Sequence, residues 1–488
     1  MSITEVEQQQ LLIGGSWVGA GSGDTFERED PWTGEVASRG AAASRDDARA
    51  AADAAAAAFP EWAATPPSAR RELLQKAAAL MMERAPEIAG IITAETGGTF
   101  GFGMFNCSLA AGMLGEAAAQ TTAVTGEVIP SDVPGLTAMA IRQSAGVVLG
   151  IAPWNAPIIL GTRAVAAPLA YGNTVVLKAS EMCPRTHGEI ARVLADAGLP
   201  DGVVNFVTHT REAAGDIVDE LIAHPAVRRI NFTGSTRVGR LVAENAGRHL
   251  KRVLLELGGK APMIVLADAD LDEAVAAAKF GAFMHQGQIC MSTERIVADR
   301  SVAGDMASRL GEKAAALNVG DPRDHATEIG PLVTAESLER VAGLVDDARS
   351  HGAEVVVGGE ADGACYKPTV LAGVTSEMRI YHEESFGPVV GVVQVDGPDE
   401  AVRVANDTEY GLAAAVFGED VPTALDLARQ IESGICHVNG STLHDEPQMP
   451  FGGVKASGFG RFGGKAAIDE FTELRWITVQ HGSRHYPI

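Results

Sequence analysis

Short apolar runs alternate with helical stretches through the middle of the chain, and this alternation limits the possible folds more than any other feature. The runs, each bounded by turn residues, are 147–151, 174–177, 203–207 and 229–232. Stretches with helical character, such as 186–197 and 238–246, separate them. Continuous apolar strands that alternate with helices form a parallel sheet covered on both faces. The sequence therefore predicts an α/β fold whose ligands bind beyond the carboxyl ends of the strands.

The alternation resumes after Gly258-Gly259 and predicts a second α/β domain. Its expected strands are 263–266, 354–357 and 388–395, and its expected helices are 270–280 and 335–348. The final run, 474–479, is strand-like and isolated. Because an unpaired strand edge is usually covered, we expect this run to pair with residues 138–142 or with a partner subunit.

The first part of the chain is predicted to be helical. Ser44 is a plausible N-cap for a helix over the alanine-rich stretch 48–58, with Pro60 just beyond its end. A second helix is predicted from about Ser68, and it or its continuation ends at Gly97-Gly98.

Composition narrows the function. The chain has 488 residues, enough for two or three domains, and its net charge of −24 argues against nucleic-acid or anionic-membrane partners. Its five cysteines are scattered without a Cys-x-x-Cys pair, so neither a disulfide framework nor a metal site is indicated. The start, Met1–Gln10, lacks the apolar core of a secretory signal, and no uncharged run approaches the roughly 18 residues of a membrane span. A cytoplasmic protein is expected.

Cys290 is a candidate nucleophile because it follows a helix in a turn-like segment, Gly287-Gln288-Ile289-Cys290. The thiolate is the reactive form, so its neighbours should lower the pKa of the thiol. The alternative is a buried cysteine that acts as a small apolar side chain.

Glu256 and Asn155 are candidates for acid–base and oxyanion chemistry. Glu256 lies inside an apolar run, where burial would raise its pKa toward neutrality and suit a general base. Its alternative role is a salt bridge to Lys260 or a nearby arginine. Asn155 lies between two prolines after a predicted strand, and its amide can donate to a developing oxyanion. Its alternative role is an ordinary turn or helix cap.

Two strand ends resemble cofactor contacts. Residues 232–239 follow a strand and open a helix, so their backbone N–H groups and Ser235 could hold a pyrophosphate. Residues 178–181 end another strand, where Glu181 could bind a ribose hydroxyl and would repel a 2′-phosphate. For each segment the alternative is simply a capped helix start.

Taken together, seven motifs in order resemble the aldehyde dehydrogenase family over nearly the whole chain. They are Pro153-Trp154-Asn155, Lys178-Ala179-Ser180-Glu181, Phe232-Thr233-Gly234-Ser235, Glu256-Leu257-Gly258-Gly259-Lys260, Gly287-Gln288-Ile289-Cys290, Glu383-Glu384-Ser385-Phe386-Gly387-Pro388 and Pro450-Phe451-Gly452-Gly453-Val454-Lys455. The resemblance implies that an aldehyde is oxidised to a carboxylic acid, with NAD as the expected cofactor and NADP as the alternative, through a thiohemiacetal and a thioester on Cys290. Relatives that transfer the acyl group to coenzyme A typically lack the carboxylate at position 256, so its presence favours hydrolysis.

The resemblance also implies the roles of individual residues. The catalytic set would be Cys290, Glu256, Asn155 and Lys178. The cofactor set would be Trp154, Lys178, Glu181, Gly234, Ser235, Gly239, Leu257, Glu384 and Phe386. Glu256 would activate the deacylating water, and Asn155 with the Cys290 N–H would hold the oxyanion.

Segments 285–295 and 431–440 are similar to the aromatic-aldehyde group of the family, which includes vanillin, salicylaldehyde and benzaldehyde dehydrogenases. The expected substrate contacts are Ala156, Leu160, Arg163, Ile289, Met291 and Phe451. Ala156 would leave room for a planar ring, and Arg163 would meet a ring hydroxyl or acidic substituent. The alternative for Arg163 is a structural ion pair.

The family resemblance implies three structural units. These are a Rossmann-like NAD-binding domain of residues 1–120 and 143–256, a catalytic α/β domain of 257–455, and a small β oligomerisation arm of 121–142 and 466–488. A homodimer or homotetramer is expected. Alternative functions are an aliphatic or semialdehyde dehydrogenase, a thiol hydrolase, and a non-catalytic structural protein.

Overall fold

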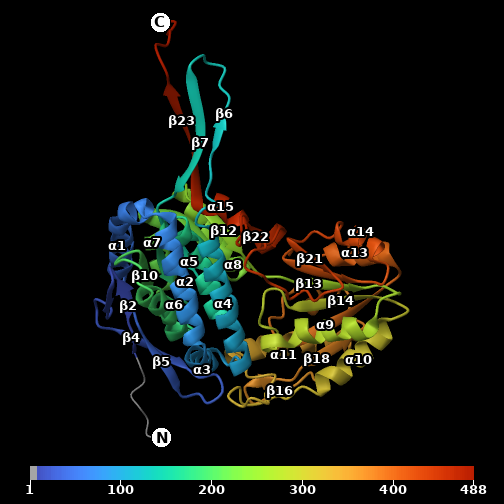
Figure 1. The fold of residues 1–488 in the computed structure, drawn as a ribbon. Helices are drawn as coiled ribbons and strands as arrows, with labels where there is room; N and C mark the ends of the chain where they lie inside the picture. Colours follow the sequence, from blue (N-terminus) through green and yellow to red (C-terminus); the bar gives the residue numbers. More distant parts are fainter. Residues whose placement is uncertain (1–7) are drawn as a thin grey trace.

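The protein is built on two large sheets that lie side by side, with a narrow β arm projecting from the first (Figure 1). The structure is a computed structural model, and it describes residues 8–488. Residues 1–7 of the predicted NAD-binding domain, and most of the Met1–Gln10 segment judged not to be a signal, lie outside the described residues.

The first sheet has eight strands in the order β22-β12-β11-β8-β9-β10-β2-β3. In that order their bounds are Gly458–Phe459, Arg252–Glu256, Val227–Thr233, Val147–Ile151, Thr174–Lys178, Val204–Val207, Leu11–Ile13 and Ser16–Val18. The five central strands, β12 to β10, are parallel. All four strands predicted for this region are confirmed, with ends displaced by at most two residues.

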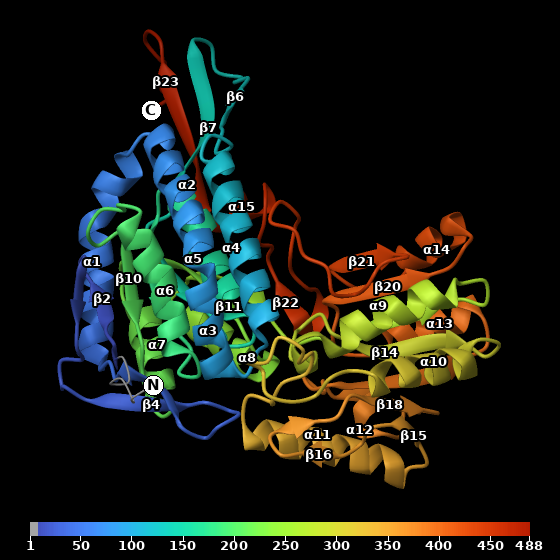
Figure 2. The ribbon, with the colours of Figure 1, turned by 60° about the horizontal axis from the view of Figure 1, so that its bottom comes forward.

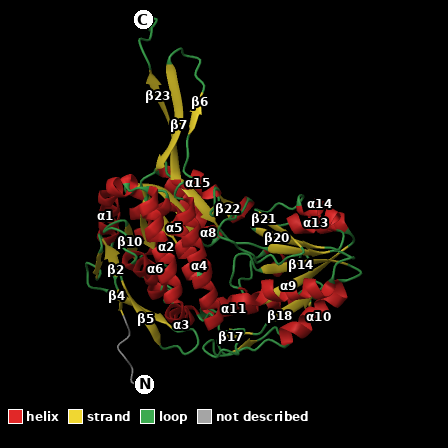
Figure 3. Ribbon diagram, viewed as in Figure 1, coloured by secondary structure: helices red, strands yellow, loops and turns green. Residues whose placement is uncertain are grey.

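Helices cover both faces of this sheet because its strands are apolar on both sides. One face packs against α1 (Arg45–Ala64), α7 (Ala214–Ala223) and α8 (Thr236–Arg248). The other packs against α5 (Pro157–Ala170) and α6 (Pro184–Asp196), and α2 (Pro67–Glu83) and α4 (Phe100–Gln120) cover these two helices in turn. Figure 3 shows α2, α4, α5 and α6 as neighbouring red helices.

The second sheet has seven strands in the order β15-β18-β19-β14-β13-β20-β21. Their bounds in that order are Glu354–Val357, Thr369–Ala372, Val389–Val395, Thr293–Asp299, Ala261–Val265, Ala413–Phe417 and Ile435–Val438. Only β15 is antiparallel to its neighbour. The helices around it, seen in Figure 2, are α9 (Leu271–Phe283) and α10 (Ala303–Ala315) on one face, and α11 (Ala335–Ser350), α12 (Arg379–His382), α13 (Pro398–Asn406) and α14 (Val421–Ala428) on the other.

The arm is a three-stranded antiparallel sheet of β23 (Thr472–Gln480), β7 (Leu136–Ser144) and β6 (Glu127–Ile129). Leu474 is in register with Arg142 and Thr478 with Ala138, so the predicted pairing of the last strand with residues 138–142 is confirmed.

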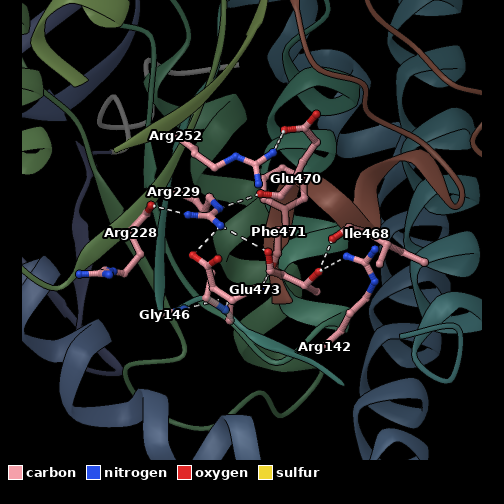
Figure 4. A network of polar contacts seen from close by, with 12 residues as sticks. Arg142, Gly146, Arg228, Arg229, Arg252, Ile468, Glu470, Phe471 and Glu473 are labelled. Carbon is pink, nitrogen blue, oxygen red and sulfur yellow. Dashed lines mark hydrogen bonds and ion pairs between the residues drawn. The ribbon is translucent and has the colours of Figure 1, made fainter. Parts of the chain in front are cut away.

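Arg229 of β11 ties the base of the arm to the first sheet (Figure 4). Its guanidinium donates to the carbonyl of Glu470 at 3.1 Å and to the carboxylate of Glu473 at 2.6 Å. Glu470 belongs to α15 (Ala466–Phe471), the short helix that leads into β23. From the other side, Arg142 donates to the hydroxyl of Thr472 at 3.2 Å.

The smaller elements complete the fold. They are β1 (Gln8–Gln9), β4 (Thr25–Glu29), β5 (Val36–Ala41), α3 (Ala85–Thr96), β16 (Ala361–Asp362), β17 (Cys365–Tyr366) and the 3₁₀ turns η1 (Met284–Gly287) and η2 (Lys455–Ser457). Helix α3 ends at Gly97 in the left-handed conformation, as the Gly97-Gly98 stop predicted.

Helix α1 begins as predicted but runs past the expected stop. Ser44 and Asp47 form a reciprocal capping box at its start. The expectation that the helix ends before Pro60 is wrong, because it continues to Ala64. Proline removes one backbone hydrogen bond, but Trp62 in the following turn is 1% exposed and packs in the core, and this burial compensates.

Among residues 8–488, we find no helix with the length and apolar character needed to cross a bilayer.

Candidate active site

The carboxyl ends of β8, β11 and β12 meet at one edge of the first sheet, and the candidate catalytic residues gather there. A cavity of about 370 Å³ opens at this edge. Its walls are Pro153, Trp154, Asn155, Thr233, Gly234, Ser235, Glu256, Leu257, Gly258, Cys290, Ser337, Arg340, Glu384 and Phe386. The structure therefore brings together residues from five of the seven sequence motifs, whereas segments 178–181 and 450–455 contribute no wall of this cavity.

Glu256 is the last residue of β12 and is fully buried, in register with Thr233 of β11. Among residues 8–488, no donor lies close enough and in the right direction to form a hydrogen bond with either of its carboxylate oxygens. Burial raises its pKa to about 7, against smaller opposing effects of the Cys290 thiol and the Arg163 charge. The alternative salt bridge to Lys260 is not formed, since Lys260 pairs with Glu294 instead. Glu256 thus has the pKa of a general base at neutral pH.

Cys290 lies in the turn after η1 and is partly exposed toward the cavity. The expectation that its neighbours lower its pKa is wrong for this structure: burial raises the pKa of the thiol well above its usual value, and the negative charge of Glu256 adds to the effect. Arg163 opposes the shift only weakly. A positive charge has to be brought into the cavity before the thiolate is favoured.

Asn155 is held against the loop that carries the cysteine. Its side-chain amide donates to the carbonyl of Gln288 at 3.0 Å, and the residue is 5% exposed. It does not cap the following helix, because the N-cap of α5 is Ala156, which makes no side-chain cap. The alternative role as a helix cap is therefore not what the structure shows.

The start of α8 separates the catalytic cavity from a second cavity of about 570 Å³. Phe232 and Val238 line the second cavity, whereas Gly234 and Ser235 line the first. The Ser235 hydroxyl caps the helix by accepting from the Val238 N–H at 3.4 Å, so this segment is a capped helix start as well as a cavity wall.

Lys178, at the end of β9, also lines the second cavity. Burial lowers its pKa, and the nearby Glu181 carboxylate opposes that shift. Gly239 has a packing explanation: a Cβ there would lie 2.4 Å from the side chain of Leu257. Its smallness lets Leu257 pack against α8.

Glu384 and Phe386 reach the first cavity from the second sheet's side. The Glu384 carboxylate accepts from the Gly259 N–H at 2.9 Å, and burial raises its pKa to about 7. Phe386 contacts Trp154 edge to face, with ring centroids 5.8 Å apart. Three residues of the predicted cofactor set, Glu384, Phe386 and Trp154, thus line the first cavity.

Five of the expected substrate contacts are apolar and buried, and none of the five lines the catalytic cavity. Ala156, Leu160, Ile289, Met291 and Phe451 belong to the large core cluster against which Cys290 packs. The segment after Asn155 is helical, as the placement of Leu160 and Arg163 requires.

Arg163 forms a structural ion pair, which was the alternative to its predicted contact with the substrate. Its guanidinium forms a buried ion pair with Asp445 and lies 4.0 Å from the centre of the Phe451 ring. Asp445 comes from a loop with no sequence signal and was not among the predicted residues.

Several other cavity residues were also missed. Ser337 and Arg340 belong to α11, and Arg340 donates to the carbonyl of Glu384 at 2.8 Å. Both lie on an ordinary amphipathic helix about fifty residues after Cys290, and no pattern in their surroundings distinguishes them.

Comparison with known proteins agrees with this geometry. The model of the aldehyde dehydrogenase family matches residues 17–477. The chain is 58% identical to a vanillin dehydrogenase of Pseudomonas sp. strain HR199 over 98% of this chain and 99% of that protein. It is 41% identical to an NAD⁺ benzaldehyde dehydrogenase of Pseudomonas putida, over 88% and 87% of the two chains.

The crystal structure of a salicylaldehyde dehydrogenase from Pseudomonas putida G7, complexed with salicylaldehyde, superimposes with a TM-score of 0.97. That chain is 46% identical, and the match covers 99% of this chain and 100% of that one. The chain belongs to the aldehyde dehydrogenase family, has its α/β fold, and is an NAD(P)-dependent aldehyde dehydrogenase.

Proposed function

We propose that this enzyme oxidises aromatic aldehydes of the vanillin type to their carboxylic acids, with Cys290 as the nucleophile and Glu256 as the base. The observation that carries this proposal is the meeting of a thiol, an unpaired buried carboxylate and an amide donor in one cavity. The high identity to the vanillin, salicylaldehyde and benzaldehyde dehydrogenases supports the aromatic class.

The reaction follows from the residues in the cavity. The Cys290 sulfur adds to the aldehyde carbon and gives a thiohemiacetal, while Asn155 and the Cys290 N–H donate to the oxygen. When bound, oxidised NAD(P) would accept the hydride that leaves the former aldehyde carbon, so that the thiohemiacetal becomes a thioester as its hydroxyl proton is lost, and the positive nicotinamide ring would favour the Cys290 thiolate. Glu256 then takes a proton from the water that hydrolyses the thioester, and Cys290 is released as the acid leaves.

The two cavities fit a dinucleotide. They lie on either side of the α8 start, where backbone N–H groups favour a pyrophosphate. We assign Lys178 and Glu181 to the adenosine ribose, and Glu384, Phe386, Trp154 and Leu257 to the nicotinamide end. Gly234 and Ser235 would contact the pyrophosphate, with Gly239 permitting the close packing below it.

We further propose that NAD is preferred over NADP, because the Glu181 carboxylate would repel a 2′-phosphate. Arg211 and Arg237 line the second cavity together with Lys178, and they would attract that phosphate once the Glu181 carboxylate is removed. A Glu181→Gln variant should therefore narrow the ratio of kcat/KM for NAD to that for NADP. An unchanged ratio would rule Glu181 out as the discriminating residue.

The substrate class is tested by following NADH absorbance with a panel of aldehydes. Hydroxylated, methoxylated and unsubstituted benzaldehydes are compared with short aliphatic aldehydes at matched concentrations. We expect the highest kcat/KM for ring-substituted benzaldehydes, because Ala156 and the apolar side chains of Leu160, Ile289, Met291 and Phe451 leave a planar ring the most contact. Faster turnover of aliphatic aldehydes would overturn the aromatic proposal but leave the family activity intact.

The contribution of Arg163 is tested in the same panel. The Arg163→Ala variant should lose discrimination between hydroxylated and plain benzaldehydes if its guanidinium also meets the ring substituent. Unchanged discrimination would mean that the ion pair with Asp445 is its whole role.

We propose that the chain divides as the sequence suggested, into an NAD-binding unit, a catalytic unit and an oligomerisation arm. The arm exposes a row of apolar side chains, with Val128 74% and Trp476 77% exposed, which supports a homo-oligomer. Light scattering after size exclusion should give a dimer or tetramer, and Trp476→Glu should shift it toward smaller species. A monomeric wild type would contradict the assignment of the arm.

A further inference from the structure

A buried ion pair lies directly beneath the loop that lines the cofactor cavity. Lys260 immediately precedes β13, and Glu294 is the second residue of β14. The Lys260 ammonium lies 2.6 Å from the Glu294 carboxylate, and the two side chains are 0% and 4% exposed. Neither residue lines the cavity, and the reaction described above uses neither.

The Glu294 carboxylate also binds the backbone of the cavity loop. It accepts from the Ser385 N–H at 2.9 Å and from the Phe386 N–H at 3.2 Å. Ser385 lies between the two cofactor-facing residues, Glu384 and Phe386. One carboxylate thus receives an ammonium from one side and two consecutive backbone N–H groups from the other.

The loop needs such an anchor because its conformation is unfavourable by itself. Phe386 has a φ of 45°, in the left-handed region that bulky side chains rarely adopt. Glu384 is held at its other end, where Arg340 donates to its carbonyl and Gly259 to its carboxylate. The contacts of Glu294 therefore fix the middle of a strained segment whose flanking side chains face the cavity.

The pair is costly for stability alone. Desolvating two charges generally cancels their attraction, and apolar residues of similar size would serve the core as well. From this arrangement we infer that Glu294, with Lys260 as its counter-ion, is a positioning residue that holds the 384–386 loop in the shape that binds the nicotinamide end of the cofactor. This inference rests on the proposed cofactor site.

Lys260 has a second effect through charge. The negative charge of the buried Glu294 carboxylate raises the pKa of the nearby Glu384 carboxyl. The Lys260 ammonium, which pairs with Glu294, opposes this shift. Without it, the Glu294 charge is left unbalanced next to the carboxylate that receives the Gly259 N–H.

The test is a double-mutant cycle on Lys260→Met and Glu294→Gln. Lys260→Met leaves a buried charge unpaired and should weaken NAD⁺ binding, measured by titration calorimetry, by about tenfold or more. In Glu294→Gln the side-chain oxygen still accepts from the loop N–H groups, while the new NH₂ group faces the Lys260 ammonium. We therefore expect a smaller loss of NAD⁺ affinity than in Lys260→Met. In the double variant the charges disappear together and affinity should return to within about threefold of the wild type.

Two further measurements separate positioning from simple damage. The rate at which iodoacetamide alkylates Cys290 without cofactor should stay within about twofold in all three variants, because the hydrogen bonds of Glu294 go to Lys260, Ser385 and Phe386 and not to the cysteine loop. A Leu74→Ala variant, which removes a fully buried side chain of α2, should lower Tm while leaving the Kd for NAD⁺ unchanged. The KM for NAD⁺ should follow the Kd, with kcat for saturating cofactor less affected.

The inference is overturned if the single variants bind NAD⁺ as the wild type does, or if the losses of the two single changes add in the double variant. Should Lys260→Met not accumulate as folded protein, Glu294→Gln and the double variant still give the decisive comparison. Failure of the wild type to bind NAD⁺ at all would instead refute the proposed cofactor site.

Discussion

Two fully buried glutamates in the same half of the molecule have opposite surroundings. Glu95 of α3 is 1% exposed and accepts four hydrogen bonds, three from the first turn of α6 and one from Ser38 of β5. Glu256 of β12 is 0% exposed, and among residues 8–488 no donor forms a close hydrogen bond with its carboxylate. Burial raises the pKa of both carboxyls.

The difference in hydrogen bonding distinguishes Glu95, a structural carboxylate, from Glu256, a carboxylate that is available for catalysis. The donors around Glu95 join three elements, and satisfying them repays part of the desolvation of the group. Around Glu256 the Cys290 thiol and the Thr233 hydroxyl are the nearby donors, and they only partly oppose the effect of burial on its pKa, so the carboxylate faces a cavity without a close hydrogen bond. An unsatisfied buried charge is costly, so its presence next to Cys290 identifies the site better than burial alone does.

The largest expected effect is on catalysis, from Glu256→Gln. The amide fills the same space but cannot take a proton from water, so kcat should fall by about 10²- to 10⁴-fold. If hydrolysis of the thioester is the step that is lost, rapid mixing should still show a burst of NADH close to one per active site. Steady turnover near that of the wild type would show that another group is the base.

The second effect is a pH-dependent stability that Glu256 should confer and Glu256→Gln should remove. The folded pKa of about 7 lies above the ordinary value of 4.5, so the protonated form favours folding and stability is lost as pH rises between these values. The difference corresponds to about 3 kcal/mol. Relative to the wild type, the variant should therefore gain about that much in urea unfolding between pH 4.5 and pH 8. A constant difference between the two proteins would contradict the raised pKa.

The strands and the reactive residues differ in how well they could be predicted from the sequence. Periodicity predicted four of the eight strands of the first sheet, β8 to β11, because each of these apolar runs is short and bounded by turns. It missed β20, since Ala413-Ala414-Ala415 has no strand preference, and only burial between β13 and β21 makes it extended. The family motifs predicted Glu256 and Cys290, which lie at strand ends and turns.

Long-range partners could not be predicted in this way. Asp445 pairs with Arg163 across 282 residues, and Arg340 reaches Glu384 from a different helix. The pKa of Cys290 likewise depends on how closely the fold encloses it and on the charge of Glu256, which spacing along the chain does not give. Sequence therefore identifies the reactive groups, whereas their electrostatic setting has to come from the fold.

Glu95→Gln should give the opposite result to Glu256→Gln, with activity kept and stability lost. Each Glu95 oxygen accepts from a backbone N–H, of Arg185 or of Thr186, so the new amide group must face one of them. Leaving that donor unsatisfied should lower the free energy of unfolding by about 1–3 kcal/mol. The measurement is the urea midpoint beside kcat for folded protein. A large fall in kcat at unchanged stability would mean that the two glutamates do not differ as proposed.

The smallest effect, and the sharpest comparison, comes from replacing one threonine in each region. Thr186 donates its hydroxyl to Glu95 at 2.6 Å, so Thr186→Val should cost about 1–2 kcal/mol of stability without changing kcat. Thr233 lies beside Glu256 and lines the cavity, so Thr233→Val should leave the urea midpoint nearly unchanged but alter the pH at which kcat rises. Each change removes a threonine hydroxyl next to a buried glutamate, and only the surroundings of the two glutamates differ. If both variants lost stability equally and kept the same pH profile, the distinction between the structural and the reactive carboxylate would fail, because each threonine would then be merely a packing residue.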